Sequence, residues 1–122
     1  YKTAEEEVQG IGQLITRFKD SGYRSLGIIC KDEPHARALH EKLKEQHPGT
    51  IFLSYQSTSY EHGIMVTYTH MAKGLEFDQV IIPHVNAKNY HTDLDRSLLY
   101  IAVTRAMHHL TVTYSGEGCR FN

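Results

Sequence analysis

Short apolar runs rich in β-branched residues alternate along this chain with longer segments of helical periodicity. The runs at 26–30, 64–68 and 80–83 are too short for helices and are typical of buried strands. Around these runs, apolar residues recur three or four positions apart, which predicts amphipathic helices. The first helical segment is marked by Val8, Ile11, Ile15 and Phe18. Alternating helices and strands predict an α/β fold with a mainly parallel sheet.

Residues with known capping preferences stand at the expected helix ends. Thr3 opens a capping-box sequence, and Gly22 suits the C-terminal stop of the first helix. Asp32 can cap the second helix, with Pro34 in its first turn. A third helix is expected over 98–106. These boundaries predict three helices distributed among the strands.

Two further strands complete a sheet of about five. We expect them at 51–55 and 110–114. The link from 56 to 63 is too short for the helical crossover that joins parallel neighbours. The strands on either side of this link are therefore expected either not to be neighbours or to run in opposite directions.

Length and charge limit the class of protein. A chain of 122 residues with 40% apolar content suits a single domain with one core, expected over 1–122. Its longest apolar runs, such as 80–82, are too short to cross a membrane. The net charge is −1, so any contact with nucleic acid is expected to be local rather than spread over a basic surface.

Cysteine and histidine usage argues against a disulfide framework and against a metal site. Cys30 and Cys119 are far apart, and we expect free thiols in a reducing cytoplasm. The nine histidines do not show the spacing of a zincin helix. The first residues resemble no signal peptide and lack an initiator Met, so we expect a cytoplasmic segment of a longer protein.

Residues 73–77 directly follow an expected strand. In an open α/β sheet, ligands bind at the carboxyl ends of the strands, and we expect this segment to lie there. Gly74 would let the backbone approach a phosphate or a sugar, with Lys73 and Glu76 as polar groups beside it. The spacing also fits an ordinary tight turn with two solvated charges.

Arg105 follows a helical segment, 98–103, that is apolar nearly all round and is therefore expected to be buried. An arginine at the end of a buried helix is rigidly placed. It either caps the last carbonyls of the helix or presents its planar guanidinium to an anion such as phosphate. The residues alone leave both interpretations open.

Three segments taken together resemble one family. Residues 70–78 read HMAKGLEFD and look like motif V, which spans 69–78 here. Residues 96–106 read RSLLYIAVTRA and look like motif VI, and 27–39, beginning GIICK, looks like motif IV. The motifs follow in the order typical of the C-terminal RecA-like motor domain of UvrD/Rep-type superfamily 1 DNA helicases. The short link between Ile51 and Tyr68 is most similar to the branch of helicase IV and the RNA-polymerase-associated helicases.

The resemblance implies a RecA-like three-layer sandwich of the phosphate-loop NTPase type. It implies half of an ATP-dependent DNA helicase or translocase, in which ATP with Mg²⁺ binds between two RecA-like domains. The chain has no phosphate-loop sequence, so the N-terminal RecA-like domain of the same polypeptide is the expected partner and source of the Mg²⁺ ligands. The isolated chain is expected to be inactive.

The resemblance also implies roles for particular residues. Arg105 is similar to the arginine finger, and Gly74 and Glu76 to the residues at the nucleotide ribose. Lys31 would stand near the phosphates. His70 and Thr69 would face single-stranded DNA.

Two departures from the family pattern concern the ligands. Lys31 stands where motif IV usually has arginine, which puts its phosphate contact in question, because lysine lacks a bidentate fork. Tyr68 occupies a position that is usually threonine, so the hydroxyl that meets DNA is open.

Two other classes of protein are alternatives to a motor domain. One alternative is a helicase-like interaction module without motor activity that docks on RNA polymerase or repair proteins. The other is a receiver-type signalling domain, which needs acidic residues at strand ends. Residues 30–31 and 67–68 stand at those ends and include no acidic residue.

Overall fold

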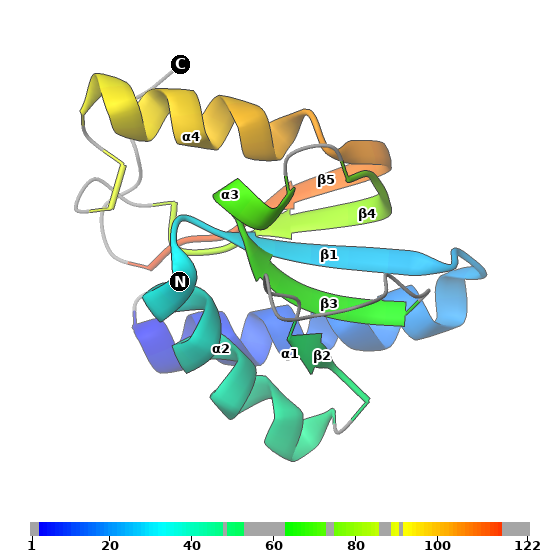
Figure 1. The fold of residues 1–122 in the computed structure, drawn as a ribbon. Coiled ribbons are helices and arrows are strands. Elements are labelled where there is room, and N and C mark those ends of the chain that lie inside the picture. Colours follow the sequence, from blue (N-terminus) through cyan, green and yellow to red (C-terminus); the bar gives the residue numbers. More distant parts are fainter. Residues whose placement is uncertain are drawn as a thin grey trace.

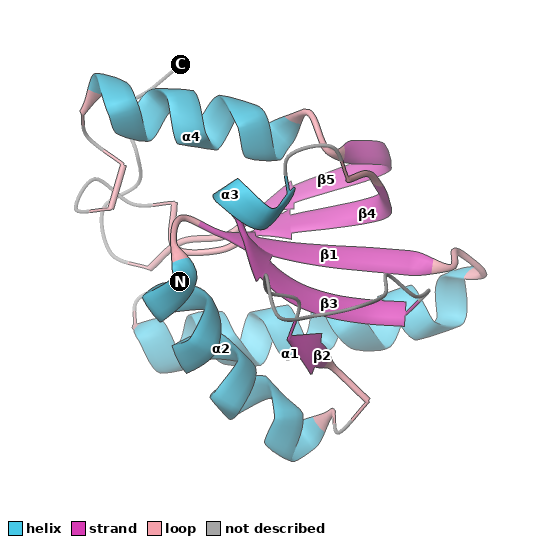
Figure 2. Cartoon of the chain, in the orientation of Figure 1, coloured by secondary structure: helices cyan, strands magenta, loops and turns pink. Residues whose placement is uncertain are grey.

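The computed structural model describes residues 3–47, 49–52, 63–72, 75–85, 89–90 and 92–115. In this part of the chain, five strands form one sheet in the order β2-β3-β1-β4-β5 (Figures 1 and 2), and every pair of neighbours is parallel. The strands are β1 (Ser25–Cys30), β2 (Ile51–Phe52), β3 (Gly63–Tyr68), β4 (Phe77–Ile82) and β5 (Ala106–Val112). The helices are α1 (Ala4–Ser21), α2 (Glu33–Gln46), α3 (Thr69–Ala72) and α4 (Asp93–Val103). The predicted α/β fold with a mainly parallel sheet of about five strands is confirmed.

Helices cover both faces of the sheet, which gives three layers (Figure 1). The first core, between the sheet and α1 and α2, contains Ile11, Ile15, Phe18, Leu26, Ile28, Cys30, Ala36, Leu39, Leu43, Ile64, Val66, Tyr68 and Ile81. The second core, beneath α3 and α4, contains Ile29, Met65, Ala72, Phe77, Val80, Ile82, Val85, Tyr90 and Ala102. All six residues of β1 are buried because both faces of this central strand are covered.

The expected helix caps are present. The Thr3 hydroxyl accepts the Glu6 N–H at 3.1 Å, and Gly22 ends α1 with a left-handed φ of 83°. Asp32 caps α2, because one of its carboxylate oxygens accepts the His35 N–H at 3.1 Å. Burial alone would raise the pKa of Asp32, but the hydrogen bonds from the His35 side chain and backbone outweigh it and lower the pKa.

We predict that Asp32→Ala lowers the free energy of unfolding by about 1 kcal/mol at pH 7, because α2 loses its cap. The folded-state pKa of Asp32 is depressed, so its contribution is present above the unfolded pKa and is lost as pH falls through the folded pKa. Urea unfolding between pH 2 and 7 measures the difference. Asp32→Asn is the control, since it keeps an acceptor without a titratable group. A difference from wild type that stays constant down to pH 2 would contradict the role of the carboxylate.

The predicted arrangement of the strands around residues 53–62 is wrong. β2 and β3 are parallel neighbours, with Ile51 opposite Met65 and Phe52 opposite Val66. Ten residues of extended chain can span roughly 33 Å, so a return along a six-residue strand needs no helix. Residues 53–62 lie outside the described residues, and so does the predicted extension of β2 to residue 55.

The predicted burial and start of the third helix are also wrong. α4 begins at Asp93, where Thr92 and Asp95 form a capping box that the sequence reading missed. Leu94 and Tyr100 are each 69% exposed, because α4 is an outer layer that no other described element covers. None of the described helices is long and apolar enough to span a membrane.

Candidate functional site

The segment from α3 to β4 runs from one edge of the sheet to the other. α3 follows the carboxyl end of β3, whereas Phe77 starts β4, which lies parallel to β1 and hence to β3. A parallel crossover must return to the opposite edge before the next strand begins. The expectation that residues 73–77 lie at the carboxyl edge is therefore wrong for Glu76, which lies at the amino edge. Gly74 lies outside the described residues.

Arg105 lies beside the segment that contains Glu76, at the amino-terminal ends of β4 and β5, the amino edge of the sheet. The Arg105 carbonyl accepts the Phe77 N–H at 2.9 Å, and Nη1 of Arg105 donates to the Leu75 carbonyl at 3.5 Å. Glu76 lies between Leu75 and Phe77 in the chain and is exposed. The structure thus places the half-buried Arg105 beside the backbone of the segment that contains the exposed Glu76.

The guanidinium of Arg105 does not cap α4. Nη2 donates to the Thr104 hydroxyl at 3.0 Å, and Nη1 points to the Leu75 carbonyl in the preceding crossover. Both acceptors lie outside α4, which ends at Val103. The geometry therefore favours the second interpretation, a guanidinium held at the surface beside the crossover, where it can receive an anion.

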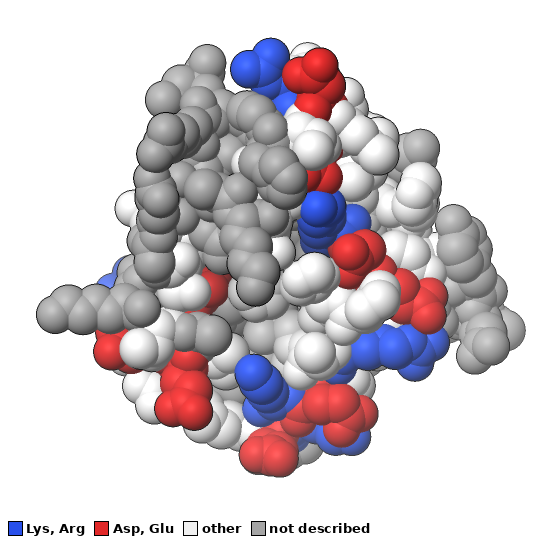
Figure 3. Space-filling model, turned by 90° about the vertical axis from the view of Figure 1, so that its left-hand side faces the viewer, with Lys and Arg blue, Asp and Glu red and all other residues white. Residues whose placement is uncertain are grey.

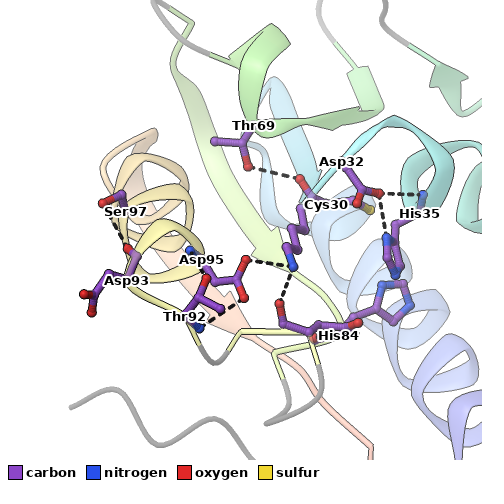
Figure 4. A network of polar contacts seen from close by, with 11 residues as sticks. Cys30, Asp32, His35, Thr69, His84, Thr92, Asp93, Asp95 and Ser97 are labelled. Atoms are coloured by element: carbon purple, nitrogen blue, oxygen red, sulfur yellow. Dashed lines mark hydrogen bonds and ion pairs between the residues drawn. The ribbon is translucent and has the colours of Figure 1, made fainter.

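Lys31 lies at the other edge of the sheet. Its Nζ forms an ion pair with Asp95 at 2.8 Å and donates to the Asn89 carbonyl at 2.6 Å (Figure 4). Lys31 follows β1, whereas Arg105 precedes β5, so the length of a six-residue strand, roughly 20 Å, separates their backbones. The structure does not bring Lys31 beside Arg105 and Glu76.

Thr69 and His70 stand in α3 at the carboxyl edge and differ in exposure. Thr69 is 0% exposed, and its hydroxyl donates to the Cys30 carbonyl at 3.2 Å. His70 is exposed. The prediction that the Thr69 hydroxyl contacts DNA finds no support in this position, because the hydroxyl faces the sheet. Of the two residues, His70 alone presents its side chain to solvent.

Glu7 is a buried polar residue that the sequence reading missed. It is 0% exposed, and one carboxylate oxygen accepts the His84 N–H at 2.7 Å and the Thr113 hydroxyl at 2.8 Å. These bonds join α1 to the ends of β4 and β5. A Glu in the first turn of a helix ordinarily faces solvent and favours the helix dipole, so its sequence context carries no signal of burial.

Two buried groups near the carboxyl edge, the His84 imidazole and the Cys30 thiol, are not reactive. Burial lowers the pKa of His84, although the Glu7 charge opposes the shift, so His84 is neutral at pH 7. Burial raises the pKa of the Cys30 thiol, with the charges of Asp32 and Glu7 acting in the same direction, so Cys30 is no nucleophile. Cys119 lies outside the described residues. No group of three or more His, Cys, Asp or Glu side chains in the described ranges could hold a metal ion.

Charges of both signs are mixed on the face drawn in Figure 3, among the residues described there. Cations are adjacent to anions, as in the exposed pairs Arg37–Glu33 and Lys44–Glu41 on α2. Long-range attraction of a polyanion by such a face is weak.

A protein-family model matches part of the second half of the chain. Residues 63–113, which run from β3 through β5, match the model of the UvrD-like helicase C-terminal domain. Over this part, which is less than half of the chain, the protein is similar to UvrD-like helicase C-terminal domains. The match includes α3, the crossover to β4, α4 and Arg105, which are the elements that form the two edges described above.

Known proteins resemble the UvrD-like domain in sequence and in fold. DNA helicase II of Escherichia coli (strain K12) is 33% identical over 96 residues, which is 64% of this chain and 13% of that protein. The RecBCD enzyme subunit RecB of Chlamydia trachomatis is 30% identical over 129 residues, or 94% of this chain and 12% of that protein. The chain thus spans a small fraction of the length of these relatives.

Solved structures show the same fold over the whole chain. The C-terminal domain of a possible DNA helicase from Lactobacillus plantarum WCFS1 has a TM-score of 0.85 at 29% identity, covering 98% of this chain and 73% of that one. The arterivirus nonstructural protein 10 (helicase), solved with DNA, has a TM-score of 0.60 at 12% identity, covering 99% of this chain and 29% of that one. The second likeness concerns the fold alone.

Proposed function

We propose that this UvrD-like domain is the C-terminal motor domain of an ATP-dependent DNA helicase or translocase, with Arg105 as its arginine finger. The proposal rests on the position of Arg105, whose bonds to the backbones of Leu75 and Phe77 place it beside the segment that contains Glu76. A guanidinium can neutralise charge on the γ-phosphate of ATP, and a carboxylate can accept a hydrogen bond from a ribose hydroxyl. Gly74 would allow the sugar to approach the crossover.

ATP with Mg²⁺ would bind between this domain and an N-terminal RecA-like domain of the same polypeptide. That domain would supply the phosphate loop and the Mg²⁺ ligands. The exposed apolar side chains of α4, Leu94 and Tyr100, support a partner on this side of the sheet. Without that partner the isolated chain is expected not to hydrolyse ATP, because half of the nucleotide site is missing.

Single-stranded DNA would bind at the carboxyl edge, where His70 is exposed. The buried Thr69 would hold α3 against Cys30 and so present His70. The names of the relatives, which are DNA helicases, support DNA as the ligand. Domain closure around ATP and reopening after hydrolysis would move this DNA contact by a step.

A second candidate is an interaction module without motor activity that docks on RNA polymerase or repair proteins. Lys31 favours it, because its ammonium group is already bound to Asp95 and Asn89.

The ten-residue link between β2 and β3 leaves no room for a large inserted subdomain, which supports placement in the branch of helicase IV and the RNA-polymerase-associated helicases. Motor activity of the longer protein distinguishes the two candidates.

We predict separate effects for the two ligands because Glu76 and His70 lie at opposite edges of the sheet. In the longer protein, His70→Ala should weaken single-stranded DNA binding about fivefold, the loss of one phosphate contact of about 1 kcal/mol, and leave the nucleotide KM unchanged. Glu76→Ala should raise the nucleotide KM and leave DNA affinity without nucleotide unchanged. Titrations of each variant with fluorescent DNA and with nucleotide measure both affinities.

Each variant is the control for the other, since both change the same crossover. Equal losses of both affinities in both variants would mean that the crossover is only structural. A loss of DNA affinity in Glu76→Ala alone would place DNA at the amino edge instead.

A further inference from the structure

Lys31 stands at the position of the phosphate-binding arginine in the motif IV pattern, yet its contacts are all internal. Its side chain is 23% exposed and that of Asp95 is 7% exposed, and the two form an ion pair of 2.8 Å. Nζ also donates to the Asn89 carbonyl at 2.6 Å and lies 5.9 Å from the centre of the Tyr90 ring. We propose that Lys31 is a positioning residue that fixes the first turn of α4, and that it is not a phosphate ligand.

The two ends of α4 are held by different forces. Its C-terminal half packs on the second core through Leu99, Ala102 and Val103. Near its N-terminus, Leu94 faces solvent and Asp95 is the buried residue. The ion pair to Lys31 therefore links this end of α4, where Figure 4 shows Asp95, to the residue that follows β1.

Asp95 joins this tie to the helix start itself. Its Oδ2 accepts the Thr92 N–H at 3.2 Å in the capping box, and its Oδ1 receives the Lys31 ammonium. The Asp95 carboxylate thus takes part in the capping box at the start of α4 and also links that helix start to Lys31, which follows β1. Loss of Lys31 would remove the ion pair of a nearly buried carboxylate, which is unfavourable.

The position of α4 matters for Arg105, which follows its last turn. α4 has eleven residues and is a rigid rod of about 16 Å, so a tilt at the Asp95 end displaces the other end as well. A misplacement of about 1 Å in a catalytic group can lower a rate 10²-fold. This step rests on the proposed function of Arg105, whereas the anchoring of α4 by Lys31 does not.

The test is a mutant cycle in the longer protein. The variants are Lys31→Met, Asp95→Asn and the double variant, in which both charges are removed and no buried carboxylate is left unpaired. Lys44→Met is the matched control, because it breaks an ion pair of 2.9 Å that is exposed on α2. Three readouts are measured: kcat with saturating DNA, nucleotide Kd, and hydrogen exchange of the α4 amides.

We expect Lys31→Met to lower kcat roughly 10- to 100-fold with nucleotide Kd changed less than about twofold. Asp95→Asn should act in the same direction, and the double variant should be no worse than Lys31→Met, since the two residues act through one contact. The α4 amides should exchange at least about tenfold faster in all three variants and at the wild-type rate in Lys44→Met.

A tenfold or larger rise in nucleotide Kd in Lys31→Met, with Asp95→Asn unchanged, would show that Lys31 binds phosphate and would overturn the proposal. Unchanged exchange of α4 would overturn it as well. If kcat proves insensitive to Arg105→Ala, the proposed arginine finger fails, and the exchange measurement still decides the role of Lys31.

Discussion

Arg105→Ala in the longer protein should lower DNA-stimulated ATP turnover by about 10³-fold, while nucleotide affinity stays near that of the wild type. An arginine finger acts on charge that develops in the transition state, and its removal costs roughly 10³ to 10⁵ in rate. The structure supports this role because the guanidinium donates to the Thr104 hydroxyl and the Leu75 carbonyl, next to Glu76 in the chain, and to no backbone carbonyl of α4. Single-turnover hydrolysis and nucleotide titration measure the two quantities.

Two further variants sharpen the interpretation of Arg105. Arg105→Lys should restore little activity, because an ammonium group lacks the planar fork that matches two phosphate oxygens. Arg17→Ala is the control, since Arg17 is exposed on α1, on the opposite face of the sheet. Normal turnover in Arg105→Ala would mean that the residue is structural and would remove the main support for the proposed function.

Gly27→Val should lower the free energy of unfolding by about 3 kcal/mol or prevent folding, the largest stability effect we expect from a single substitution. Gly27 lies in the central strand β1, and a Cβ there would lie 2.5 Å from the ring of Phe77. Overpacking of a closed core costs about 1 to 3 kcal/mol, and valine adds further methyl groups against the same ring. The ring of Phe77 has little room to move, because Phe77 is 0% exposed within the second core.

Gly12→Ala is the matched control for Gly27→Val. A Cβ at Gly12 would meet its nearest atoms at 3.5 and 3.6 Å, which is ordinary contact, and the residue lies within α1. Alanine there should raise the free energy of unfolding by about 0.5 to 1 kcal/mol, because glycine is unfavourable in a helix. Urea unfolding of both variants gives the comparison, and a stable Gly27→Val variant would show that Phe77 can be displaced.

The elements of this protein could be predicted where local signals are strong. Thr3 and Asp32 start helices by accepting N–H groups three residues ahead, and Gly22 ends α1 with a left-handed φ; all three caps are present. The continuous apolar run at β1 indicates a strand buried on both faces, which is how it lies. Such signals depend on residues a few positions apart and therefore survive without knowledge of the fold.

Predictions that depended on neighbours across the sheet were less successful. The expectation that β2 and β3 are not neighbours or run in opposite directions was wrong, because chain length alone does not determine how a link returns to the sheet. The burial of α4 was wrong because apolar composition does not say whether a second layer exists to cover it. The buried role of Glu7 has no local signal, since its partners are 77 and 106 residues away.

The candidate site divides in the same way. From the sequence alone, the motifs around His70, Glu76 and Arg105 predict which side chains would carry the chemistry, because they can be recognised from residue types and spacing. Only the tertiary structure decided which of them meet. Parallel strands send each crossover back to the opposite edge, so Glu76 joins Arg105 while His70 stays at the other end. The same topology pairs Lys31 with Asp95, because charges far apart in sequence meet only where the strand ends and helix starts converge.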